Sequence, residues 1–231
     1  MLEEYKLITH RGLHEDGAPE NSLLAFSKSA QSNYAIELDV HVTKDGHVVV
    51  FHDYNLKRMT GVDKIVEEST LEEIKELYLD NTAEKIPTLM ETLACINGKV
   101  PLLIEMKNER FPGLLEKKLL EILKDYDGKY MVQSFNMLSV RWFKKNAPNI
   151  LRGKLATKTK RNLAYKIDNI IAYIIAKPDF VSYRFEDISE RLIKICKTFK
   201  LDLICWTVRS KEDYIKASKF CSGIIFENFK I

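Results

Sequence analysis

Short runs of β-forming residues alternate with helical segments along the chain, and this alternation constrains the fold more than any other feature. Eight of these runs are expected to be strands, at 6–10, 35–39, 101–106, 130–134, 150–155, 179–183, 202–206 and 222–226. Helices are expected between them, and an acidic residue three positions after Thr70, Thr88 and Ser210 marks a helix start in each case. Eight strands separated by helices in 231 residues predict an α/β fold, a (β/α)8 or TIM barrel. A doubly wound parallel sheet is the alternative.

The connection after the second strand is unusually long. Residues 40–86 exceed an ordinary βα loop, so we expect a small insertion subdomain there, within a single barrel domain over residues 1–231. The insertion opens with a return strand, VVVFHD at 48–53. A two-residue turn at Asp45-Gly46 would pair Lys44 with His47 and set His52 opposite Asp39.

Composition excludes several classes of protein. The 36 basic and 33 acidic residues leave a net charge of +3, which gives no case for a nucleic-acid-binding protein. No signal peptide is recognisable, and the most apolar segment, at 170–176, is too short to span a bilayer. We therefore expect a cytoplasmic protein without stable membrane insertion; the sequence predicts no oligomeric state. The cysteines lack metal or redox spacing and are expected to be reduced core thiols: Cys95, Cys196, Cys205 and Cys221.

Acidic and basic side chains gather where the predicted strands end. In TIM barrels the carboxyl ends of the strands carry the catalytic groups. Here those ends carry His10 and Arg11, Glu37 and Asp39, Glu105 and Lys107, and the aromatic residues Phe135 and Trp206. Three carboxylates that converge repel one another unless a cation neutralises them. Oxygen ligands without cysteine favour one hard divalent cation, Mg²⁺ or Ca²⁺, held by Glu37, Asp39 and Glu105.

Each of these features also has a plainer interpretation. His10-Arg11-Gly12 alone could be a strand end and turn, and Glu37 with Asp39 could be the solvated face of an edge strand. A buried barrel strand such as LLIEMK at 102–107, however, offers no solvated face before its end. Phe135 and Trp206 are more often core residues than pocket walls. The other histidines, His14, His41 and His47, are expected to be solvent-facing or structural.

Eight short motifs appear in a fixed order: HRG at 10–12, PENS at 19–22, ELDV at 37–40, HD at 52–53, IPT at 86–88, IEMK at 104–107, QSF at 133–135 and WTV at 206–208. With these motifs the chain resembles the glycerophosphodiester phosphodiesterases, a family of the phospholipase-C-like phosphodiesterase superfamily. The resemblance covers nearly the whole chain and implies a barrel with an insertion after the second strand. It also implies metal-dependent hydrolysis of a small-molecule glycerophosphodiester to an alcohol and glycerol 3-phosphate.

The resemblance assigns roles by position. Glu37, Asp39 and Glu105 match the metal ligands; His10 and His52 match the acid–base pair; Arg11 and Lys107 match the phosphate contacts. Phe135 and Trp206, at the ends of their predicted strands, are further candidate substrate-binding residues. Two residues depart from the family pattern: Ser22 stands where threonine is commoner, and Glu227 stands where the last strand usually has aspartate. Two alternatives remain: a lysophospholipase D-type enzyme, and a non-catalytic binding protein derived from the enzyme.

Overall fold

The computed structural model describes residues 2–109, 111–158, 173 and 175–231. The strands are β1 (Leu7–Thr9), β2 (Ala35–Val42), β3 (Val48–Val50), β4 (Leu102–Met106), β5 (Tyr130–Ser134), β6 (Arg152–Ala156), β7 (Phe180–Arg184), β8 (Asp202–Val208) and β9 (Gly223–Phe226). The helices are α1 (Leu23–Gln31), α2 (Lys57–Thr60), α3 (Leu71–Lys75), α4 (Leu89–Ile96), α5 (Leu114–Leu123), α6 (Met137–Asn146), α8 (Glu190–Phe199) and α9 (Lys211–Ala217). Short 3₁₀ turns lie at Glu3–Tyr5, Val66–Glu68 and Phe185–Asp187.

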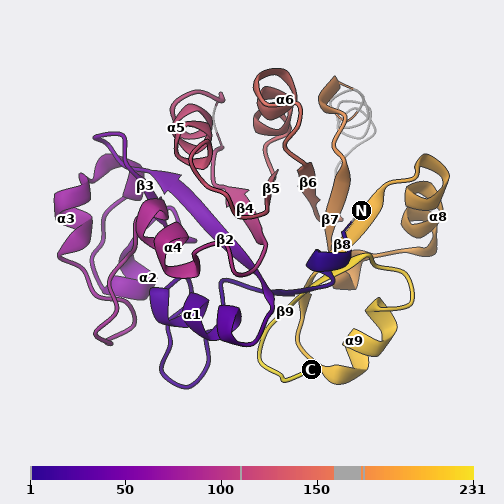
Figure 1. Ribbon diagram of the computed structural model, residues 1–231, viewed down its shortest axis with the longest axis horizontal. Helices are drawn as coiled ribbons and strands as arrows, with labels where there is room; N and C mark the ends of the chain where they lie inside the picture. The colour runs from indigo at the N-terminus through magenta and orange to yellow at the C-terminus, as the bar shows by residue number, and fades with distance from the viewer. Residues whose placement is uncertain (1, 110, 159–172, 174) are drawn as a thin grey trace.

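The strands close into a barrel. The sheet runs β1-β9-β8-β7-β6-β5-β4-β2-β3, and a further pairing of β1 with β2 closes the ring. All pairings around that ring are parallel, and only β3 is antiparallel, on the outer edge of β2. The helices lie outside the strands (Figure 1). The predicted TIM barrel and its eight strands are thus confirmed, with ends that differ by up to three residues.

Apolar side chains pack on both faces of the barrel sheet, in the barrel centre and between the strands and the helices. One residue from each of seven strands packs in the barrel centre: Ile8, Ala35, Leu103, Met131, Phe180, Ile204 and Ile225. Gly153 is required there because a Cβ at this position would lie 1.9 Å from the Phe180 ring. Outward-facing residues such as Leu38, Ile104 and Val132 pack against the helices. The barrel centre is therefore mostly apolar.

The predicted helix starts are present. Thr70 and Thr88 each form a reciprocal capping box with the glutamate three residues later, and Ser210 accepts a hydrogen bond from the backbone of Asp213. No helix among the described residues is long and apolar enough to cross a membrane. Most of the apolar segment at 170–176 lies outside the described residues.

The hairpin register differs from the prediction by one residue. Val40 pairs with Val50 and Val42 with Val48, so Phe51 rather than His52 faces Asp39 across the ladder. The turn has three residues, because the backbone N–H of Thr43 donates to the carbonyl of His47. Three-residue hairpin loops commonly end in a left-handed residue, and Gly46 has φ of 86°. His52 therefore reaches the barrel mouth from beyond the end of β3.

Candidate active site

The three predicted metal ligands meet at the carboxyl end of the barrel. Parallel pairing of β2 with β4 sets Asp39 beside Glu105, and Glu37 precedes Asp39 by two positions on the same face. One oxygen from each carboxylate lies within 4.8 Å of the others. All three side chains are buried. This cluster can hold a cation with oxygen ligands alone.

The carboxylates strongly perturb one another. Burial, followed by the charges of Asp39 and Glu105, raises the pKa of Glu37 well above its usual value. Burial and Asp39 also raise the pKa of Glu105 to about 7, although the ammonium of Lys107 opposes this. Burial would raise the pKa of Asp39 too, but Lys107, His52 and Arg11 hold it below its usual range. Without a metal ion, the cluster therefore tends to take up protons.

One oxygen of Asp39 has no hydrogen bond among the described residues. Oδ1 is buried, and its nearest cation, Nζ of Lys107, lies 3.5 Å away. The other oxygen, Oδ2, accepts a hydrogen bond of 3.0 Å from Nδ2 of Asn21. A buried carboxylate oxygen without a partner is costly. A divalent cation among Glu37, Asp39 and Glu105 would satisfy that oxygen and offset the mutual repulsion, so the donor set fits Mg²⁺ or Ca²⁺.

Two cations flank the carboxylates. Nζ of Lys107 lies 2.9 Å from Oε1 of Glu105. Burial lowers the pKa of Lys107. The negative charges of Asp39 and Glu105 outweigh this effect and raise the pKa above its usual value, so the ammonium stays charged. The backbone N–H of Arg11 donates to Glu37 at 3.0 Å, and its guanidinium Nε lies 3.5 Å from Asp39. These positive charges are available to an anionic substrate at the barrel mouth.

A tight turn aims Arg11 at the cluster. Arg11 and Gly12 have φ of 55° and 82°, and a Cβ on Gly12 would lie 2.8 Å from Cβ of Ala25. Only glycine fits both the conformation and the contact with α1. The guanidinium is also held by Glu20, 2.8 Å from Nη1. The HRG motif thus fixes the direction of the arginine.

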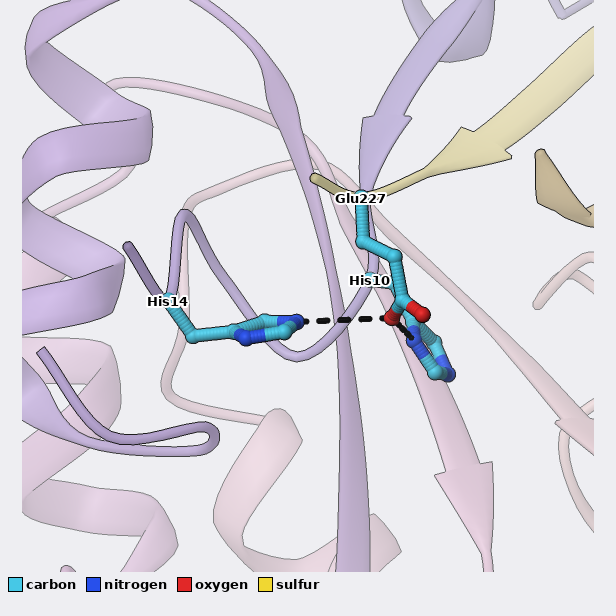
Figure 2. A group of neighbouring side chains, drawn as sticks. All are labelled: His10, His14 and Glu227. Carbon is cyan, nitrogen blue, oxygen red and sulfur yellow. Dashed lines mark hydrogen bonds and ion pairs between the residues drawn. The ribbon is translucent and has the colours of Figure 1, made fainter. Parts of the chain in front are cut away.

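His10 lies at the end of β1 and is held from the last strand. Its Nδ1 donates to Oε2 of Glu227 (Figure 2). The other oxygen of Glu227 lies 2.7 Å from Nε of Arg209. Burial lowers the pKa of His10, and the hydrogen bond to Glu227 opposes that shift. A carboxylate on Nδ1 fixes the tautomer and directs Nε2 away from Glu227.

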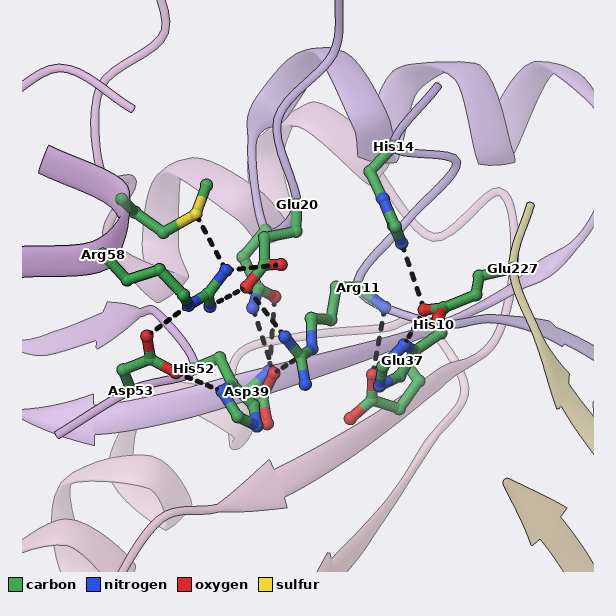
Figure 3. A network of polar contacts seen from close by, with 12 residues as sticks. His10, Arg11, His14, Glu20, Glu37, Asp39, His52, Asp53, Arg58 and Glu227 are labelled. Carbon is green, nitrogen blue, oxygen red and sulfur yellow. Dashed lines mark hydrogen bonds and ion pairs between the residues drawn. The ribbon is translucent and has the colours of Figure 1, made fainter. Parts of the chain in front are cut away.

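His52 has a matching arrangement on the insertion. Its Nδ1 lies 2.6 Å from Oδ1 of Asp53, and its carbonyl accepts a hydrogen bond of 3.3 Å from the buried ring of His41. Burial is the main cause that lowers the pKa of His52, while Asp39 opposes it. In Figure 3 the imidazoles of His10 and His52 lie on either side of Arg11. The site therefore has two imidazoles, each held by its own carboxylate.

Residues 10–229 match the Glycerophosphoryl diester phosphodiesterase family. The chain belongs to this family. It is 35% identical over 244 residues to a glycerophosphodiester phosphodiesterase of Caldanaerobacter subterraneus, covering 96% of this chain and 93% of the relative. A solved glycerophosphodiester phosphodiesterase of Thermotoga maritima is 26% identical with a TM-score of 0.78, covering 95% of this chain and 93% of that one.

The fold is also that of an Oleispira antarctica phosphodiesterase solved in complex with the product sn-glycerol-3-phosphate. The TM-score is 0.80 at 23% identity, and the likeness covers 96% of this chain and 92% of that one.

Two aromatic residues of this phosphodiesterase, Phe135 after β5 and Trp206 in β8, contact each other. The rings of Phe135 and Trp206 meet edge to face, with centroids 5.7 Å apart. Phe135 is 47% exposed, and Trp206 packs partly against the barrel core. Nε1 of Trp206 is buried without a hydrogen bond among the described residues. The ring of Phe135 is thus partly exposed to solvent, while Trp206 contacts both this ring and the apolar core of the barrel.

Sequence reasoning missed several residues that support this phosphodiesterase site. Glu227 entered only as a departure from the family pattern, His14 was expected to be solvent-facing or structural, and Asp53 was assigned no role. Lys154 was not considered; its Nζ lies 5.7 Å from the centroid of the Phe135 ring and donates to the carbonyl of Phe135. These contacts depend on tertiary packing, and only the unusual Glu227 left a signal in the sequence.

Proposed function

We propose that this protein is a metal-dependent phosphodiesterase that cleaves small glycerophosphodiesters to an alcohol and glycerol 3-phosphate. The observation that carries the proposal is the buried cluster of Glu37, Asp39 and Glu105, within 4.8 Å of one another and beside Arg11 and Lys107. The names of the relatives support the substrate class, as does the glycerol 3-phosphate bound to the Oleispira antarctica protein.

Charge stabilisation is divided between the cation and the protein. A divalent ion held by Glu37, Asp39 and Glu105 would act as a Lewis acid toward a phosphate oxygen. Glu20 and Asp39 fix the guanidinium of Arg11, which would donate hydrogen bonds to the phosphate of the substrate. Lys107 adds a buried ammonium. Both side chains stabilise the negative charge that accumulates on the equatorial oxygens in the transition state.

The two imidazoles divide the proton transfers. With Nδ1 of each ring held by Glu227 or Asp53, Nε2 is the atom left for proton transfer to or from the substrate. One of His10 and His52 takes the proton of the nucleophile, and the other gives a proton to the leaving alkoxide. Burial lowers the pKa of both rings, which favours the neutral form required of a base near pH 7.

The deciding experiment measures release of the headgroup alcohol after the protein has been stripped of metal by a chelator, with glycerol 3-phosphate as the second product expected from the two glycerophosphodiesters. Glycerophosphocholine, glycerophosphoethanolamine and a lysophospholipid serve as substrates. We expect no turnover without metal and recovery with Mg²⁺ or Ca²⁺. Full activity in demetallated protein would refute the metal assignment, and cleavage of the lysophospholipid alone would favour the lysophospholipase D alternative. His10→Ala and His52→Ala should each lose about 10²–10⁴-fold in turnover while remaining folded.

A further inference from the structure

A second group of metal-binding side chains lies beside the carboxylate cluster. His14 is in the loop after β1, and its ring points toward Glu227 (Figure 2). Nε2 of His14 is buried and makes no hydrogen bond of good geometry in the described part of the chain; Oε2 of Glu227 lies 3.4 Å away. This nitrogen is therefore buried without the close partner that such an atom normally has.

The same carboxylate oxygen also contacts His10. Nδ1 of His10, Nε2 of His14 and an oxygen of Glu227 all lie within 4.8 Å of one another. Arg209 holds the opposite oxygen of Glu227 at 2.7 Å, which directs Oε2 toward the two rings. Two imidazoles and one carboxylate form a ligand set typical of zinc and related ions. The cluster of Glu37, Asp39 and Glu105, made of oxygen ligands alone, suits hard ions instead.

We propose that His10, His14 and Glu227 bind a borderline transition-metal ion such as Zn²⁺, and that this binding inhibits the enzyme. The ion would bind Nδ1 of His10 in place of the proton shared with Glu227; the neutral ring would then carry its one proton on Nε2 instead, with no net proton release. His10 would then lose the carboxylate contact that orients it and would be fixed to the metal. The inhibitory part rests on the proposed catalytic role of His10, whereas the binding part does not.

The local charges set the expected strength of binding. Two neutral imidazoles and one carboxylate give the ion a single compensating charge, and the guanidinium of Arg209 opposes a cation. The site also supplies only three protein ligands, which leaves a fourth position for water. We therefore expect reversible binding that is weaker than at a closed structural zinc site.

The test measures metal binding and inhibition separately, with saturating Mg²⁺ present throughout to occupy the carboxylate cluster. Calorimetry with Zn²⁺ and absorption spectroscopy with Co²⁺ report binding, and turnover of glycerophosphocholine reports inhibition. His14→Ala removes one ligand, and His14→Asn is the second variant. His47→Ala is the matched control, because the His47 side chain is 54% exposed on the hairpin. Thermal unfolding checks that each variant is folded.

We expect wild-type protein and His47→Ala to bind one Zn²⁺ and to be inhibited by it. In His14→Ala and His14→Asn, the affinity for Zn²⁺ and the inhibition midpoint should both weaken by about tenfold or more. The Co²⁺ spectrum should show d–d bands without sulfur-to-metal charge transfer, which excludes the four free thiols, Cys95, Cys196, Cys205 and Cys221, as ligands.

Three results would overturn the proposal or part of it. Unchanged zinc binding in both His14 variants would place the ion elsewhere and refute the site. A thiolate charge-transfer band would likewise assign the ion to cysteine. Binding that depends on His14 but leaves turnover intact would keep the site and refute inhibition through His10. Because Mg²⁺-dependent turnover is measured without zinc in the same series, failure of the proposed function is seen independently.

Discussion

Oδ1 of Asp53 lies 2.6 Å from Nδ1 of His52, so the imidazole of His52 is held by the residue that follows it in the sequence. The other oxygen of Asp53 is 2.6 Å from Nε of Arg58, whose Nη2 is 2.6 Å from Glu20 (Figure 3). Since Glu20 also binds Arg11, these contacts link His52 to the guanidinium of Arg11. Orientation of His52 therefore depends on contacts between the insertion and the loop after β1.

Asp53→Asn tests this link. The amide keeps the shape of the side chain but no longer favours the Nδ1–H tautomer, so we expect kcat to fall about 10- to 100-fold with a small change in KM. Steady-state kinetics on glycerophosphocholine measure both constants. Asp63→Asn is the control, since Asp63 is 63% exposed on the same insertion and contacts Lys57 and Asn55. Equal kcat in the two variants would show that Asp53 does not orient His52.

Glu227→Gln should change the pH dependence as well as the rate. Burial lowers the pKa of His10, and Glu227 opposes that shift, so removal of its charge should lower the pKa further. If His10 is the base, the acidic limb of the pH profile of kcat/KM should move to lower pH. If His10 is the acid, the alkaline limb of that profile should move to lower pH. We expect a loss of about 10- to 100-fold in kcat. Profiles of kcat/KM against pH measure the shift.

Two further variants sharpen that experiment. Glu227→Asp keeps the charge on a shorter side chain, so it should recover part of the lost rate and restore the position of the limb. Glu212→Gln, on the exposed surface of α9, is the control for removal of one negative charge. Superimposable profiles for wild type and Glu227→Gln would contradict a positioning role for Glu227.

Glu37→Gln should weaken metal binding and stabilise the metal-free protein. Burial and the charges of Asp39 and Glu105 raise the pKa of Glu37, which means that the ionised form is unfavourable when no cation is present. The amide removes that charge, and its oxygen can still accept the hydrogen bond from the backbone of Arg11. We expect a higher melting temperature in chelator, a smaller rise on addition of Mg²⁺ or Ca²⁺, and loss of turnover.

Differential scanning calorimetry with and without metal measures these shifts. Glu121→Gln is a suitable control, because Glu121 is 43% exposed on α5 and pairs with Lys118 alone among the described ion pairs. A variant that melts lower in chelator than wild type would show that Glu37 is favourably ionised without metal. Full metal stabilisation in Glu37→Gln would remove this residue from the ligand set.

The barrel and the carboxylate cluster were predictable because both depend on strand periodicity. Asp39 pairs with Glu105 between parallel strands, and Glu37 is two positions before Asp39 on the same face, so strand pairing brings the three together whatever the details of the loops. The hairpin register was not predictable from Asp45-Gly46 alone. Thr43 Oγ1 donates to Asp45 at 2.6 Å and accepts from the backbone of His47 at 2.9 Å, and these side-chain bonds support the longer turn.

Contacts between side chains on strands that are distant in the sequence could not be predicted from the sequence alone. Glu227 and His10 are 217 positions apart and meet only because β9 pairs with β1. The longer side chain of Glu227 at a position where aspartate is usual hinted at an altered contact without naming its partner. Lys154 gave no signal, since its contacts with Phe135 depend on how β5 and β6 end.

Lys154 supplies a pH-dependent test of stability. Its Nζ donates to the carbonyls of Phe135 and Leu155 at 2.8 and 2.5 Å, and burial lowers its pKa from 10.5 to about 8 against the opposing charge of Glu105. Between pH 8 and 10.5 the unfolded chain therefore binds more protons at this residue than the folded chain, so the free energy of unfolding rises with pH. Below pH 8 both states are protonated, and the cost of the buried charge is fully present.

Lys154→Met should abolish this rise while keeping the apolar stem of the side chain. Relative to the variant, wild-type protein should gain up to about 3 kcal/mol between pH 8 and 10.5, because one pKa unit corresponds to about 1.4 kcal/mol. The hydrogen bonds to two carbonyls favour the ammonium and make this an upper bound. Urea unfolding across that range measures the difference, and Lys118→Met, at a side chain 40% exposed, is the control. A constant difference between wild type and Lys154→Met would mean that Lys154 is charged in the folded protein throughout, despite its burial.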